Sequence, residues 1–191
     1  MRFASKIDAT SAYYSCGRQG MKELWRKYYT EIITILAMII VGTCMHFVCD
    51  IFDSAGAKRV LAALFPVGES LMEHMKMLWY PFLGAGVILT VAKKDAGYLG
   101  GFVIGGIVAM MAMTALFVFY QSLSGKSILP LDITLYVIVI VLSALLAFLL
   151  SRETWCRRGT PLWITIAIAV TATIIYLAYR PGAGYLFQEG K

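Results

Sequence analysis

Five long apolar stretches constrain the fold of this chain more than any other feature of its sequence. A helix needs about 20 consecutive apolar residues to cross the hydrocarbon core of a bilayer, at a rise of about 1.5 Å per residue. The stretches of this kind are residues 31–52, 69–92, 98–121, 132–150 and 161–179. The sequence therefore predicts an all-α fold, a polytopic transmembrane helical bundle of about five spans.

The composition supports a protein whose main partner is the lipid bilayer. Apolar residues make up 60% of the 191 residues and charged residues 15%, whereas a soluble domain averages about 45–50% and about 25%. The net charge is +6, but the Lys and Arg residues lie in the gaps between the apolar stretches, so no nucleic acid is expected as a partner. The chain contains no Walker-type glycine loop, so no nucleotide is expected either.

The polar segments divide the chain into three parts. Residues 1–30 form a basic segment with Trp25, Tyr28 and Tyr29, which suits the cytoplasm or a helix lying in the headgroup region. Residues 31–179 hold the transmembrane bundle, and residues 180–191 form a C-terminal tail. Residues 60–66 are too few for a sixth span, so a short interfacial or re-entrant helix is expected there.

Lys and Arg residues are distributed unequally over the two sides of the predicted spans. Eleven lie in the N-terminal tail and in the loops after the second and fourth spans, and six lie on the opposite side. An excess of basic residues marks the cytoplasmic side of a membrane protein. We therefore expect a multi-pass protein of the cytoplasmic membrane, with its N terminus in the cytoplasm and its C terminus outside.

Glycines are concentrated in the third predicted span. Gly101 and Gly105 form a GxxxG pair, which allows the backbone of another helix to approach closely. That helix belongs to the same chain, to a second copy in a homo-oligomer or to another membrane protein. The sequence leaves these alternatives open.

Histidine and carboxylate side chains are concentrated where the first span ends and the second begins. Both histidines of the protein lie there. Residues four apart share a face of a helix, so His46 and Asp50 share a face of the first span, and Ser70 and His74 share a face of the second. The candidate binding residues are His46, Asp50, Glu69, Glu73 and His74, and the supporting residues are Ser70, Lys76, Asp53 and Asp132.

Three functions are compatible with this cluster. Imidazole and carboxylate groups can hold a divalent metal such as zinc, which would support a membrane hydrolase. The same groups can bind protons or another cation, which would support a small transporter or carrier. In the third alternative Lys76 and the histidines neutralise the carboxylates, and the cluster is a polar staple in a structural or interaction subunit. An unpaired charge inside the membrane costs at least about 2.5 kcal/mol, so each alternative requires the charges to be matched.

Two resemblances bear on the cluster. The patterns HFxxD, PxxES and EHxKMxWYP between His46 and Pro81 resemble a family of small, uncharacterised bacterial integral membrane proteins of unknown function, which implies the same polytopic fold and no particular activity. Ser70 and His74 also resemble the SxxxH element of the alkaline ceramidase and adiponectin-receptor membrane hydrolases. That group also uses an HxxxH pair in its last helix, whereas this chain has no histidine after His74. A zinc ion here would need His46 and nearby carboxylates instead.

Overall fold

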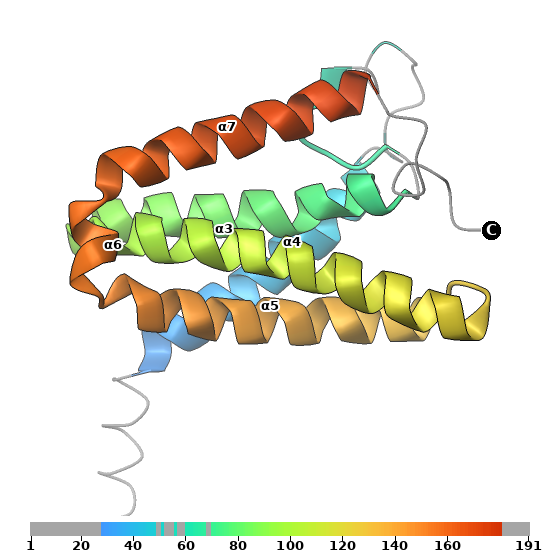
Figure 1. The fold of residues 1–191 in the computed structure, drawn as a ribbon, viewed down its shortest axis with the longest axis horizontal. Helices are drawn as coiled ribbons and strands as arrows, with labels where there is room; N and C mark the ends of the chain where they lie inside the picture. The colour runs from blue at the N-terminus through green and yellow to red at the C-terminus, as the bar shows by residue number, and fades with distance from the viewer. Residues whose placement is uncertain (1–27, 49–50, 52–55, 57–59, 68–69, 181–191) are drawn as a thin grey trace, which may run out of the picture. The chain divides into compact units, whose positions relative to one another are not determined.

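The computed structural model describes residues 28–48, 51, 56, 60–67 and 70–180. This part of the chain is helical and contains no strand. Its helices are the first span Tyr28–Val48, α3 (Leu71–Lys93), α4 (Gly97–Ser124), α5 (Leu129–Ser151), α6 (Thr154–Arg158) and α7 (Thr160–Tyr179) (Figure 1). The predicted N-terminal interfacial helix falls within residues 1–30, of which residues 1–27 lie outside the described part.

All of these helices except α6 are long and apolar enough to cross a membrane. This result confirms the predicted all-α, polytopic bundle, and the protein is a multi-pass membrane protein. The helix ends differ from the predicted ones by a few residues. For example, α4 continues to Ser124 and ends at Gly125, which adopts a left-handed conformation with a φ of 70°. The short helix α6, between α5 and α7, was not predicted.

The chain divides into two compact units, Met1–Thr34 and Ile35–Lys191. Of the first unit, the structure describes residues 28–34, which open the first span. The second unit contains the rest of the first span and the helices α3 to α7. The packing described below is that of the second unit.

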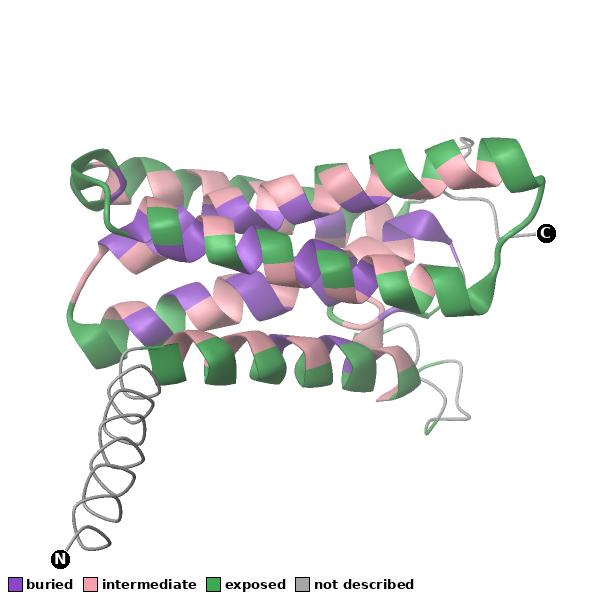
Figure 2. Cartoon of the chain, turned by 90° about the horizontal axis from the view of Figure 1, so that it is seen from below, coloured by how far each residue is buried: buried purple, intermediate pink, exposed green. Residues whose placement is uncertain are grey.

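Helix α4 is the centre of the second unit and packs along α3 on one side and α5 on the other. Three phenylalanines connect these helices. The ring centroids of Phe82 and Phe102 are 6.1 Å apart, and those of Phe102 and Phe148 are 5.1 Å apart. Phe82 and Phe102 are completely buried. Figure 2 shows that the buried positions concentrate on the facing sides of the helices, while the outer faces are exposed as expected for helices that contact lipid.

The predicted glycine pair lies against α5 of the same chain. A Cβ atom added at Gly105 would lie 2.8 Å from Ala147 Cβ and 3.0 Å from the Ser143 carbonyl oxygen. At Gly101 it would overlap the Ala147 carbonyl oxygen. The helix that packs closely on this glycine pair is therefore α5 of the same chain.

Replacement of Gly105 by leucine should destabilise the bundle, because the new side chain has no space between α4 and α5. We expect the free energy of unfolding in detergent to fall by about 1–3 kcal/mol or more. Gly84→Ala is the matched control, since a Cβ atom there meets nothing within 4 Å, and it should be neutral or slightly stabilising. Equal stability of the Gly105→Leu variant and the wild type would contradict the close packing.

Candidate functional site

The candidate site is built around the N-terminal end of α3. Ser70 is the N-cap residue, with an extended backbone, and its Oγ accepts a hydrogen bond from the Glu73 backbone N–H at 3.4 Å. Glu73 lies in the first helical turn, where a negative charge is stabilised by the positive end of the helix dipole. Ser70 and Glu73 have the S-x-x-E spacing of a capping box. This signal predicts the start of α3 at Leu71, and our sequence analysis missed it.

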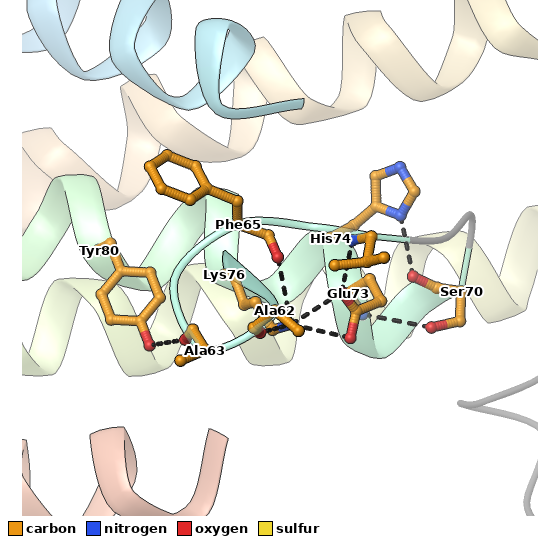
Figure 3. A network of polar contacts seen from close by, with 9 residues as sticks. Ala62, Ala63, Phe65, Ser70, Glu73, His74, Lys76 and Tyr80 are labelled. Atoms are coloured by element: carbon orange, nitrogen blue, oxygen red, sulfur yellow. Dashed lines mark hydrogen bonds and ion pairs between the residues drawn. The ribbon is translucent and has the colours of Figure 1, made fainter. Parts of the chain in front are cut away.

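Lys76 is completely buried, and its ammonium group is surrounded by acceptors. Its Nζ lies 2.8 and 2.7 Å from Oε1 and Oε2 of Glu73. It also donates to the carbonyl oxygens of Ala62 at 2.7 Å and Phe65 at 3.5 Å. Figure 3 shows these contacts converging on the ammonium group. A buried ion is tolerated when its charge is paired and its remaining protons are hydrogen-bonded, and Lys76 meets both conditions.

The same network fixes the segment before α3, where a short interfacial or re-entrant helix was predicted. Val60 and Leu61 are helical, and the chain then turns, with the Phe65 N–H donating to the Leu61 carbonyl oxygen at 2.9 Å. The Tyr80 hydroxyl donates to the Ala63 carbonyl oxygen at 2.6 Å. Glu73 Oε2 accepts from the Val67 N–H at 2.8 Å. Side chains of α3 thus satisfy backbone groups that the turn leaves without helical partners.

The two histidines of the protein face each other from different helices. The ring centroids of His46, in the first span, and His74, in α3, are 5.3 Å apart with an interplanar angle of 37°. Nδ1 of His74 lies 2.9 Å from the Ser70 carbonyl oxygen. Because a carbonyl oxygen can only accept, Nδ1 must carry the proton, and Nε2 of the neutral ring is then the acceptor atom and potential metal ligand.

The distance between the imidazoles limits their combined charge. Two positive charges 5.3 Å apart repel each other by about 3 kcal/mol at an effective dielectric constant of about 20. A single cation held between the rings avoids this repulsion, because both imidazoles bind it in their neutral form.

The other candidate residues are distributed differently. Asp50, Asp53 and Glu69 lie outside the described residues. Asp132, at the start of α5, accepts hydrogen bonds from the Ser127 hydroxyl at 2.7 Å and from the Tyr120 hydroxyl. These contacts connect Asp132, in the first turn of α5, to the end of α4 and to the turn between the two helices.

A metal site remains a prediction. Within the described part of the chain, no three His, Cys, Asp or Glu side chains come together as ligands. The histidine pair supplies two imidazole donors, and a tetrahedral zinc site needs three or four protein ligands. Of the predicted carboxylate ligands, Asp50 and Glu69 belong to the segments that the structure does not describe.

Removal of the buried Lys76 ammonium group should lower the stability of the protein. In a Lys76→Met variant the Glu73 carboxylate loses its counter-charge and the carbonyl of Ala62 loses its donor, so the free energy of unfolding should fall by about 3–5 kcal/mol. The control is Lys126→Met, because Lys126 is exposed after α4 and its replacement should change stability by less than about 0.5 kcal/mol. Chemical unfolding in detergent measures both. Similar, small effects of the two substitutions would contradict the structural role of Lys76.

Comparison with known proteins gives a family and no activity. No curated protein and no solved structure matches the chain. A family model described as a family of unknown function (DUF6512) matches residues 20–188. The chain therefore belongs to this family.

Proposed function

We propose that this member of the family is a small cation carrier that binds its cation between His46 and His74. The observation that supports the proposal is the 5.3 Å separation of the two imidazoles, which belong to two different candidate spans. A cation held by both rings would link the first span to α3. Its release would remove that link, which is the kind of ligand-dependent contact on which a conformational equilibrium in a carrier depends.

The charges around the pair favour this function over a purely structural one. Glu73 and Lys76 already neutralise each other within α3, so this ion pair supplies the charge balance that the polar staple required. The histidines are not required for it. Imidazole nitrogens are preferred ligands of zinc and of similar divalent transition metals, and they release such ions when they are protonated. A membrane hydrolase would need a third ligand and a metal-bound water, and no further observation favours that alternative.

Binding of Zn²⁺ and Co²⁺ to the detergent-purified protein tests the proposal. We expect about one ion per chain and an affinity that decreases as the pH is lowered into the range where imidazoles protonate. His46→Ala and His74→Ala should each weaken binding by at least about tenfold, the range seen even for residues that only support a ligand. Because the ion is shared, the double variant should lose little more than either single variant.

The control is Asp132→Asn, which removes a carboxylate that accepts hydrogen bonds from Ser127 and Tyr120 at the start of α5, and it should leave binding unchanged. If the histidine-free double variant binds either metal like the wild type, the histidine pair is not the site. If it does not, metal uptake into proteoliposomes decides whether binding is coupled to transport. Uptake by the wild type and not by the double variant is the expected result, and binding without uptake would contradict a carrier.

We also propose that the N terminus lies in the cytoplasm and that the protein resides in the cytoplasmic membrane. The support is the excess of Lys and Arg in the N-terminal tail and in the loops after α3 and α5. In a cysteine-free background, Lys126→Cys should react with a membrane-impermeant maleimide added to intact cells, because Lys126 is exposed in the α4–α5 turn. Trp155→Cys, at the opposite end of the bundle, should react only after lysis. The reverse pattern would invert the topology.

A further inference from the structure

Basic side chains gather at the end of the bundle where α3 is followed by α4 and α5 is followed by α6. The ion pair between Arg157 Nη2 and Asp95 Oδ2, at 2.8 Å, connects these two segments. Helix α6 also packs against α4, and Figure 1 shows it beside the ends of α3 and α5. The exposed basic residues of this region are Lys93, Lys94, Arg152, Arg157 and Arg158.

Acidic residues in the same region leave a positive excess. They are Asp95 and Glu153. Both carboxylate oxygens of Asp95 already have partners, since Oδ1 accepts from the Gly97 N–H at 3.0 Å and Oδ2 binds Arg157. Asp95 therefore fixes the start of α4 and the position of the Arg157 guanidinium. An anion from outside the protein would meet more basic than acidic groups here.

Aromatic and aliphatic side chains border the basic residues. Trp155 of α6 is 47% exposed, and its ring centroid lies 5.6 Å from that of Trp163 in α7. Leu162, at the start of α7, is 56% exposed. Tryptophan prefers the level of the lipid headgroups, and the exposed leucine lies in the first turn of a candidate span. The region thus offers basic groups, an exposed indole and the apolar start of a span.

We infer that this surface, formed by Lys94, Arg157, Arg158, Trp155 and Leu162, binds an anionic phospholipid. Lys94 and the two arginines contact the lipid phosphate, and the apolar pair contacts the glycerol and the first part of an acyl chain. A basic group near a membrane surface adds affinity for anionic lipid through its charge, and the guanidinium groups also match the geometry of a phosphate. This inference is independent of the cation site, since it involves neither histidine.

Lipid retention measured by native mass spectrometry tests the inference. The detergent-purified protein is mixed with phosphatidylglycerol or with phosphatidylcholine of the same acyl chains. We expect preferential retention of phosphatidylglycerol, and this preference should decrease roughly fivefold for each basic residue removed from the surface. The Lys94→Gln, Arg158→Gln double variant keeps the Arg157–Asp95 ion pair. Lys126→Gln removes a basic residue from the α4–α5 turn and is the matched control.

The expected result is a lost preference in the double variant and an unchanged preference in the Lys126→Gln control. Equal retention of both lipids by the wild type, or an unchanged preference in the double variant, would overturn the inference. Displacement of the lipid by inorganic phosphate alone would also overturn it, because the apolar contacts would then contribute nothing. If the double variant does not fold, the salt dependence of retention by the wild type replaces it, and a preference that does not weaken at high salt rejects the surface.

Discussion

Inside a bilayer, each backbone N–H and C=O group must find its hydrogen-bond partner within the protein, because hydrocarbon offers none. The helices meet this requirement by themselves. The turn before α3 does not, and its carbonyl oxygens accept hydrogen bonds from Lys76 and Tyr80. Burial of a lysine is otherwise unfavourable in a membrane. Here the turn supplies the carbonyl oxygens that accept hydrogen bonds from the Lys76 ammonium group. Glu73 then compensates the charge, and the end of α3 beside His74 is fixed as a result.

The polar cluster between the first span and α3 consists of two parts with different chemistry. Glu73 and Lys76 are fully engaged with each other and with the backbone, so they hold the turn in place. His46 and His74 contribute two imidazole rings with centroids 5.3 Å apart, whose nitrogens can act as ligands. Ser70, the N-cap residue of α3, connects the two parts, because its hydroxyl oxygen accepts from the Glu73 N–H and its carbonyl oxygen accepts from the His74 ring. A structural staple and a binding site are therefore compatible in one place.

The number and approximate positions of the spans could be predicted from the sequence, because the thickness of the bilayer sets the length and apolarity of a span. The GxxxG spacing also predicted close packing at Gly101 and Gly105, and the structure shows that the partner is α5. The pairing of the Lys76 ammonium with the Ala62 carbonyl could not be foreseen, since it depends on how the turn folds back onto α3. The same holds for Trp79, whose indole N–H donates to the Thr171 hydroxyl of α7 at 2.9 Å. Contacts between distant segments leave no periodic signal in a sequence, whereas the S-x-x-E cap is local and was readable.

Helix α7 buries only Ala167 and Ile174, so most of its surface is available to lipid. Its 20 residues span about 30 Å, close to the average hydrocarbon thickness. Trp79, which is completely buried, holds α7 through a hydrogen bond to Thr171, two turns before its end. A bilayer that becomes thinner or thicker can be accommodated by tilting of a helix, and packing against neighbouring helices limits the tilt. Packing therefore opposes a change of tilt less at α7 than at α3, α4 and α5, which pack closely on one another.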